Sequence, residues 1–568
     1  MRKRMIPLVV LAALAIATFG RASGNPPDTR APAKAQAPGQ SNAQKAAAQP
    51  ATYKLLAWSE LGMHCMDGKD YSIFAVLPPY NTVHAQLIKM GEPPLPITTG
   101  VTITYEATAD ATGSINTISS TKTNFWSYIY VLFRNNNPPD VGLKGNHTQN
   151  LTPHPLSYDS ANAYWTAEGI PTMPYDDQGK RNPYSMAKIV ARDTKGNVLA
   201  TAKIVLSVSD EMSCSTCHAS NSDVYAKPAA GWVNNPNPAK DAKLNILRKH
   251  DDRWPISQYL AQLRNNGYAY QSKLYDTAIS GTPILCAACH GDNALGLAGI
   301  SGIKPLTNAM HTLHGPQVLQ STGTTLDVNS STSDLKSCYL CHPGPTTLCK
   351  RGAMSTQLCS NCHGNLTTVG ASTLGGSTRT GWLVEPACQM CHTNSQRYTT
   401  AFNAPNHWRV STDPTFATNP NRPVAGTQLY RYSAGHGTVY CSACHGSPHA
   451  EFPTLQANDN VYSQSLQGHT GKIAECSVCH TSVPNTANGG PHKMHNVGQN
   501  WVNAHSDYAE RVGVAACAYC HGSNYRGSFL SKTSMARSLN ADDYGQKNYK
   551  AGDVVSCYDC HNGPNGGG

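Results

Sequence analysis

The sequence predicts a multidomain chain in which an all-β, sandwich-like domain precedes a longer, loop-rich and mostly irregular region of short helices. Residues 52–210 contain runs of β-branched and aromatic residues that Pro, Gly and Asn interrupt, as is typical of strands joined by turns. Residues 211–568 are dense in Pro, Gly, Asn, Ser and Thr and show little helical periodicity. This second composition favours loops and short helices.

Residues 1–24 form a predicted signal peptide for secretion. The cationic start MRKRM precedes the apolar run IPLVVLAALAIATFG, and the small residues of RASG then offer a cleavage site. No other stretch has the roughly 18 apolar residues that a membrane-spanning helix needs. We therefore expect an exported mature chain without a transmembrane span.

Residues 25–51 form an expected flexible linker. They are mostly Ala, Pro and Gln, and such a segment buries too little apolar surface to offset the entropy lost on ordering. The formal charge of +10 at first suggests nucleic acid. However, Arg2, Lys3, Arg4 and Arg21 belong to the predicted signal peptide, and no basic cluster remains after its removal. We therefore expect no nucleic-acid partner.

Strands are expected throughout residues 52–210, which we interpret as a docking or positioning domain. The expected β runs are SIFAVLPPYNTVHAQLI, VTITYEATA and NFWSYIYVLF, and the run SMAKIVARDTKGNVLATAKIVLSVSD predicts a hairpin with TKGN at its turn. The segment GMHCMDG holds the ligand types of a copper site. Successive side chains of a strand face opposite ways, so His64, Cys65 and Met66 do not favour copper.

The pattern C-x-x-C-H occurs nine times after residue 210 and uses 18 of the 20 cysteines. It is the attachment signal for c-type haem. Two cysteines one helical turn apart reach the two vinyl groups of one porphyrin, and the histidine then lies under the iron. Zinc knuckles do not need a histidine after every pair, a thioredoxin-like C-x-x-C occurs singly, and disulfide frameworks show no such triplet. The sequence therefore predicts nine haems c.

The predicted attachment residues are Cys214, Cys217, Cys286, Cys289, Cys338, Cys341, Cys359, Cys362, Cys388, Cys391, Cys441, Cys444, Cys476, Cys479, Cys517, Cys520, Cys557 and Cys560. The predicted proximal iron ligands are His218, His290, His342, His363, His392, His445, His480, His521 and His561. Consecutive motifs begin between 21 and 72 residues apart, so the region is not a tandem solenoid. With about 40 residues for each motif, we expect the haems themselves to form much of the core.

The sixth iron ligand distinguishes an electron carrier, which fills that position, from an enzyme that binds substrate at iron. Ten further histidines lie in the same region as the motifs, and we expect nine of them to be distal ligands. These candidates are His250, His311, His314, His407, His436, His449, His469, His492, His495 and His505. Met310, Met354 and Met494 are alternatives for one haem at most. Which nine histidines ligate stays open, and no catalytic residue is assigned.

Four segments resemble the exported multihaem c-type cytochromes of metal-respiring bacteria, the extracellular electron transfer group. They are GHGTVYCSACHGSPHAEFP, GHTGKIAECSVCH, GPHKMHNVGQNW and ACAYCHGSNYRG. The resemblance covers about residues 211–568, the nonahaem cytochrome c domain. It implies electron transfer along mostly bis-histidine haems in periplasmic or extracellular respiration, with redox proteins or extracellular electron acceptors as partners. Because some members polymerise, it leaves self-association or a filament open.

Two other functions remain as alternatives to an electron carrier. A multihaem oxidoreductase would act on a small nitrogen or sulfur oxyanion at one open haem, and an adhesin would carry haem for structure alone. The variant C-x-x-C-K would mark an open catalytic haem, but Lys350 follows Cys349 with Thr at position 346. The absence of this variant favours the carrier.

Cys65 and Cys349 are the two cysteines outside the motifs. Exported proteins occupy an oxidising compartment in which paired cysteines form disulfides. We therefore predict a disulfide between them that attaches the β-rich domain to the haem-binding region. The alternatives are two buried thiols that do not meet and a link between chains.

Overall fold

The computed structural model describes residues 52–320, 323–327, 337–374, 388, 430–487 and 489–565, with the backbone of 377–378 and 419–420. Residues Ala51–Gly568 form one compact unit, and all the structure reported below belongs to it. The predicted signal peptide and linker, residues 1–51, lie outside the described residues.

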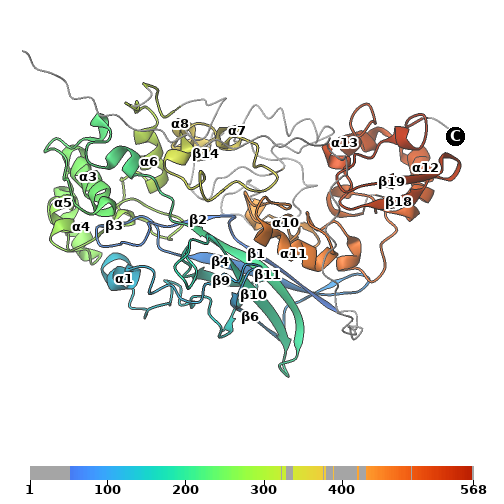
Figure 1. Cartoon of the computed structure of the whole chain (residues 1–568), viewed down its shortest axis with the longest axis horizontal. Coiled ribbons are helices and arrows are strands. Elements are labelled where there is room, and N and C mark those ends of the chain that lie inside the picture. The colour runs from blue at the N-terminus through green and yellow to red at the C-terminus, as the bar shows by residue number, and fades with distance from the viewer. Residues whose placement is uncertain are drawn as a thin grey trace, which may run out of the picture. The chain divides into compact units, whose positions relative to one another are not determined.

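Two five-stranded sheets form the first part of this unit (Figure 1). In the first sheet the order is β1 (Tyr53–Ser59), β4 (Asn81–Lys89), β9 (Tyr164–Ile170) and β8 (Ser157–Asp159), and β5 (Leu95–Ile97) pairs with β4. In the second sheet the order is β2 (His64–Cys65), β11 (Val198–Ser209), β10 (Tyr184–Asp193), β6 (Val101–Thr108) and β7 (His154–Pro155). Strand β2 runs parallel to β11, and β10 runs antiparallel to both of its neighbours.

One hydrophobic core joins the two sheets. Leu55 and Ala85 of the first sheet share it with Ile103, Ile189 and Leu206 of the second. Each of these side chains is at most 1% exposed, which is the burial expected where two sheets pack face to face. The β-rich prediction for residues 52–210 is therefore confirmed, and this shared core favours the sandwich-like interpretation.

The predicted hairpin is formed by β10 and β11, which pair antiparallel from Tyr184 opposite Ser207 onward. The turn lies at the predicted TKGN segment, where Gly196 has φ +86°. Glycine adopts this left-handed conformation without steric penalty. The Asp193 carboxylate accepts hydrogen bonds from the backbone N–H groups of Lys195 and Asn197, at 2.9 and 2.8 Å, and so stabilises the turn.

The segment NFWSYIYVLF does not form the expected β run, because residues Phe125–Phe133 are helix α1. Its buried side chains, Phe125, Ile129 and Leu132, recur at a spacing of four and three residues, so they form one apolar helical face. The helix ends at Arg134, which has a left-handed backbone and donates its N–H to the Tyr130 carbonyl. The aromatic and β-branched composition of this segment favours a strand, but its apolar residues have the spacing of a helix.

Short helices and loops follow the second sheet, as expected for the later region. The helices are α2 (Ser215–His218), α3 (Pro238–Arg253), α4 (Leu260–Asn265), α5 (Leu274–Ile279), α6 (Leu306–His314), α7 (Cys359–His363), α8 (Leu366–Val369), α10 (Cys441–His445), α11 (Ala457–Gln467), α12 (Gln499–Val512) and α13 (Ala518–His521). The small strand pairings join β3 (Phe74–Ala75) to β12 (Ile284–Leu285), β13 (Thr373–Leu374) to β14 (Ser377–Thr378), β16 (Ser433–His436) to β15 (Asn419–Pro420) and β17 (Val439–Tyr440), and β18 (Arg537–Asn540) to β19 (Gln546–Tyr549). Among the described helices, none is long and apolar enough to cross a membrane.

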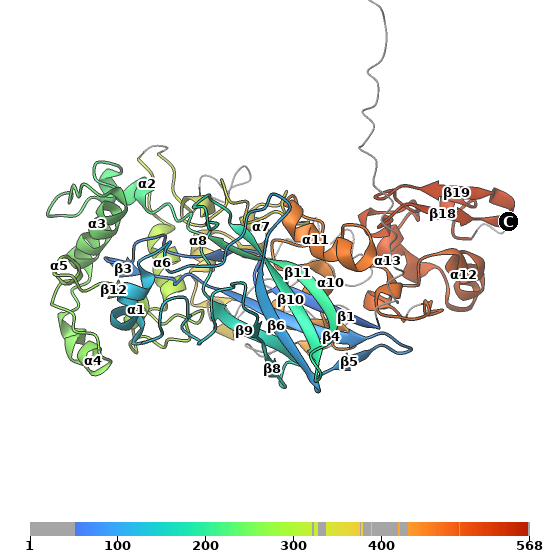
Figure 2. The same ribbon diagram turned by 60° about the horizontal axis from the view of Figure 1, so that its bottom comes forward.

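Both sheets contact the later region, where α10 lies beside β1 and α11 lies beside β11 (Figures 1 and 2). Trp58 stacks on Tyr440 with ring centroids 5.5 Å apart, and Ala443 belongs to the same buried cluster. The Gln86 side-chain amide donates a hydrogen bond of 2.8 Å to the Thr438 carbonyl. The division at residue 210 stays a prediction, since these contacts cross it.

Burial of Asp67 predicts a pH dependence of stability. Desolvation raises the pKa of this carboxyl from 3.8 to about 6, although it accepts hydrogen bonds from the backbone N–H groups of Val76 and Leu77. Between these pH values the unfolded chain has released the proton that the folded chain retains. We therefore expect this group to lower the free energy of unfolding by up to about 3 kcal/mol as the pH rises from about 4 to 6.

Denaturant unfolding at several pH values checks this expectation, with Asp67→Asn as the comparison. In a plot of the free energy of unfolding against pH, the variant should lack the part of the slope that Asp67 contributes. Equal slopes in both proteins over this pH range would contradict the assignment.

Candidate haem-binding sites

Each described C-x-x-C-H motif forms a single helical turn. In five motifs the histidine N–H donates to the carbonyl of the first cysteine at 2.8–3.1 Å, and the other three motifs lie in or at the start of α7, α10 and α13. Residues three apart in such a turn share one face. Both sulfur atoms can therefore reach one planar group. The motif of Cys388, Cys391 and His392 lies outside the described residues except for Cys388.

Each of the eight predicted proximal histidines in the described part of the chain faces one of the predicted distal histidines. The pairs and their ring-centroid separations are His218 with His314, 6.3 Å; His290 with His250, 6.4 Å; His342 with His311, 6.0 Å; His363 with His449, 6.0 Å; His445 with His492, 5.9 Å; His480 with His436, 6.2 Å; His521 with His495, 6.3 Å; and His561 with His505, 6.0 Å. The structure thus gives every described motif an opposing imidazole.

These separations fit one iron atom between each pair of rings. An imidazole nitrogen binds a first-row metal at about 2.0–2.1 Å and lies about 1.1 Å from its ring centre, so two rings on opposite sides of one metal have centroids about 6 Å apart. The observed range is 5.9–6.4 Å. Because two cysteines of a C-x-x-C-H turn adjoin every pair, the residues fit covalently attached haem with two axial histidines.

Backbone carbonyls orient many of these rings by accepting a hydrogen bond from Nδ1. The seven rings with this bond, at 2.6–3.1 Å, are those of His290, His311, His314, His495, His505, His521 and His561. A proton held on Nδ1 leaves Nε2 available to a metal, and such a partner also fixes the ring orientation. The bonds therefore favour ligation through Nε2.

Burial keeps several of the paired histidines neutral. Desolvation lowers the pKa of His218, His250, His449 and His495 to about 4. A metal binds the neutral imidazole, so a low pKa removes competition from protons at neutral pH. This electrostatic environment suits iron ligation.

Adjacent ligands on one short element serve different motifs. Helix α6 carries His311 and His314, which face His342 and His218. Likewise His492 and His495 face His445 and His521. In each of these two cases the histidines are three residues apart in the sequence. These pairings bring the first motif to the third, and the sixth to the eighth.

His469 is the described candidate that the structure does not bring to a motif histidine. Its Nδ1 lies 2.9 Å from the Thr470 carbonyl, and its Nε2 lies 3.4 Å from Glu475 Oε1. Glu475 also accepts a hydrogen bond of 2.7 Å from Arg537. The remaining candidate, His407, lies outside the described residues.

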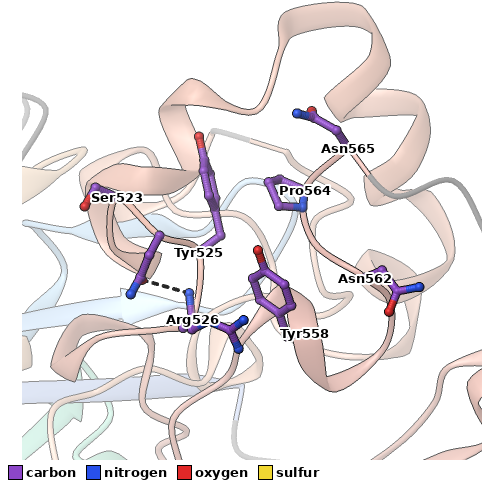
Figure 3. Close-up of a pocket in the computed structure, with 8 residues that line it drawn as sticks. Ser523, Tyr525, Arg526, Tyr558, Asn562, Pro564 and Asn565 are labelled. Carbon is purple, nitrogen blue, oxygen red and sulfur yellow. Dashed lines mark hydrogen bonds between the residues drawn. The ribbon is translucent and has the colours of Figure 1, made fainter.

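An open pocket of about 590 Å³ lies at the last motif (Figure 3). It is lined by Ser523, Asn524, Tyr525, Arg526, Tyr558, Asn562, Pro564 and Asn565. The Arg526 guanidinium lies 3.9 Å from the centre of the Tyr558 ring, and Tyr558 stands between Cys557 and Cys560 in the sequence. The pocket therefore places a cation and two tyrosines beside a predicted haem attachment site.

Cys65 and Cys349 are free thiols in the structure, so the predicted disulfide is not formed there. Cys65 lies in β2 beside β11, and Cys349 packs against Met63 and its buried neighbours. The Cys349 Sγ lies 4.0 Å from Nδ1 of His449. Burial raises the pKa of Cys349 to about 11 and that of Cys65 further. Both groups are therefore protonated thiols at neutral pH.

We expect both thiols to react slowly with an alkylating reagent in the native protein, because the thiolate is the nucleophile. Unfolding without a reductant should expose them, and mass mapping should then find both Cys65 and Cys349 alkylated. The 18 motif cysteines, which the predicted haem attachment would block, serve as the internal control. Alkylation of Cys65 and Cys349 only after reduction would instead show a disulfide.

The motifs and their opposed histidines define a multihaem c-type cytochrome as the class that these sites fit. Residues 351–565 match the family model of outer membrane cytochromes described as MtrC/MtrF-like, domains II/IV. This match confirms the resemblance to multihaem cytochromes of the extracellular electron transfer group. No curated protein and no solved structure matches the chain.

Proposed function

We propose that this chain carries single electrons along nine covalently attached haems c in extracellular respiration. The observation that carries the proposal is the set of eight opposed histidine pairs, each beside a C-x-x-C-H turn. The match to MtrC/MtrF-like outer membrane cytochromes supports multihaem electron transfer independently of that geometry.

The cysteines of each motif hold one haem, and the opposed histidines supply its two axial ligands. Each bound haem supplies reversible one-electron chemistry between Fe(III) and Fe(II). For the motif at Cys388 and Cys391, outside the described part of the chain apart from Cys388, we propose His392 and His407 as the pair. His407 is the candidate that remains after the eight pairings and the bonding of His469 to Glu475.

The paired imidazoles favour an electron carrier over an enzyme. A haem that binds substrate at iron needs an open axial position, and all eight described motifs have an opposing histidine. Reduction of a small nitrogen or sulfur oxyanion, the alternative function, would therefore require the motif of His392, which the structure does not describe.

The order of ligands along the chain supports electron transfer between neighbouring haems. Helix α6 joins the first and third motifs, and the segment of His492 and His495 joins the sixth and eighth. His505 in α12 faces His561 of the ninth motif. The ninth motif therefore joins the sixth and eighth in this group. Short shared elements of this kind hold redox groups from different motifs close together.

The family match also guides our proposal for location and partners. We propose an exported protein at the cell surface, as for an outer membrane cytochrome, which passes electrons to extracellular acceptors or to other redox proteins. The sequence leaves self-association, including a filament, open to measurement of the native mass.

A voltammetric experiment on the purified holoprotein tests the proposal. Bis-histidine haems in one chain should give a broad, overlapping wave at negative potentials, because each added electron opposes the next. Soluble ferric complexes should reoxidise the reduced protein, and nitrite and sulfite should give no catalytic current. A catalytic current with either oxyanion, without oxidation by the ferric complex, would overturn the carrier function.

A further inference from the structure

The loop between β4 and β5 contacts the seventh C-x-x-C-H motif. The Gly91 N–H lies 3.4 Å from the Cys479 carbonyl, and Gly91 forms a parallel bridge with His480. Residues nearly 400 positions apart are thereby paired through the backbone. The β-rich domain thus contacts the proximal ligand of one haem directly.

Glu92 makes two hydrogen bonds at this junction. Its Oε2 lies 3.1 Å from Nδ1 of His480, and its Oε1 accepts the Ser482 N–H at 3.0 Å. The Glu92 side chain is 39% exposed to solvent, and a solvated glutamate is a carboxylate at neutral pH. An anion therefore lies at the remote nitrogen of a predicted iron ligand.

This environment differs from that of the seven rings whose Nδ1 bonds to a backbone carbonyl. A carboxylate accepts a stronger, charge-assisted hydrogen bond than a neutral carbonyl does. It draws the Nδ1 proton toward itself and makes the imidazole a more basic ligand. A more basic axial ligand stabilises Fe(III) relative to Fe(II), and second-shell hydrogen bonds are among the features by which proteins tune haem potentials.

We propose that Glu92 is a positioning residue that lowers the reduction potential of the haem held by Cys476, Cys479 and His480. The inference rests on the proposed function, because it requires haem at this motif. It assigns to the β-rich domain a direct part in electron transfer. The domain then sets the reduction potential of one haem in the series, in addition to its part in the fold.

The experiment uses His436→Ala as the background. It compares the double variant with Glu92→Gln and His436→Ala with the single variant His436→Ala. Removal of His436 leaves the haem at His480 five-coordinate, so its absorption is distinct from that of the low-spin haems. Glu92→Gln keeps an oxygen acceptor but removes the charge. We expect the electron affinity of this haem to rise about tenfold, a positive shift of about 59 mV for one electron.

Resonance Raman spectroscopy of the reduced protein supplies a second readout. The iron–histidine stretch of the five-coordinate haem should fall in frequency when Glu92 is replaced, because the proximal imidazole becomes less basic. A purely structural role for Glu92 would not move this band. Glu510→Gln in α12 is the control, since it removes one exposed charge on another element.

An unchanged potential and an unchanged stretch in Glu92→Gln would overturn the inference, as would an equal shift in Glu510→Gln. Failure of the proposed function would look different. The His436→Ala protein itself would then lack a reducible high-spin haem. The two failures are therefore distinguishable within one set of samples.

Discussion

Replacing His436 with alanine is expected to convert one haem in the chain from six-coordinate low-spin to five-coordinate high-spin. The rings of His436 and His480 have centroids 6.2 Å apart, as two ligands of one iron require. His436 is exposed at the end of β16, so its removal should leave the fold intact. The reduced variant should bind carbon monoxide at one haem, and the potential of that haem should rise by on the order of 100 mV.

His469→Ala is the matched control for this substitution. The sequence places His436 and His469 similarly, five and seven residues before a motif. The structure, however, pairs His469 with Glu475 rather than with a predicted proximal histidine. We expect His469→Ala to remain fully low-spin and not to bind carbon monoxide. High-spin haem in His469→Ala, with none in His436→Ala, would reverse the assignment.

Replacing Arg351 with methionine is expected to lower the free energy of unfolding by about 3–5 kcal/mol, because it leaves a buried carboxylate without its cation. Arg351 and its partner Asp459 have side chains that are 1% and 6% exposed, and two hydrogen bonds of 2.6 and 3.0 Å join them. The Arg351 guanidinium also donates to the carbonyl of Gly62, at the start of the β-rich domain. The pair thus connects three segments that are distant in the sequence.

Two further variants distinguish the loss of this buried ion pair from the loss of a charge alone. The double variant Arg351→Met with Asp459→Leu should recover most of the lost stability, since no buried charge remains unpaired. Lys240→Ala removes a partly exposed pair with a separation of 3.8 Å to Asp70, and should change stability by less than about 1 kcal/mol. Denaturant unfolding followed by far-ultraviolet circular dichroism measures the free energy of unfolding of all three variants. A change of under 1 kcal/mol in Arg351→Met would contradict the assignment.

Haem attachment could be predicted from the sequence because the attachment motif is local. Two cysteines and one histidine within five residues need only one helical turn, and the described motifs form that turn. The β-rich character of residues 52–210 was also predictable, because alternating runs and the turn at Gly196 are local signals. The later region was predictable in composition but not in the path of its loops.

The distal ligands could be counted but not assigned from the sequence. His449 faces His363, and His314 faces His218, so these two pairings each span more than 80 residues. His469 satisfied every sequence criterion, and only the fold shows its contact with Glu475. Glu92 was not predicted at all, because nothing near it in the sequence indicates His480. Contacts of this kind depend on tertiary structure.

Electron paramagnetic resonance of the fully oxidised holoprotein tests the central claim most directly. Every haem should be low-spin, because we propose two histidine ligands for each iron. Two types of low-spin signal should appear, because the rings of His311 and His342 lie within 14° of parallel, whereas those of His250 and His290 are 82° apart. A high-spin signal that integrates to one or more haems in the unaltered protein would contradict ligation of every iron by two histidines.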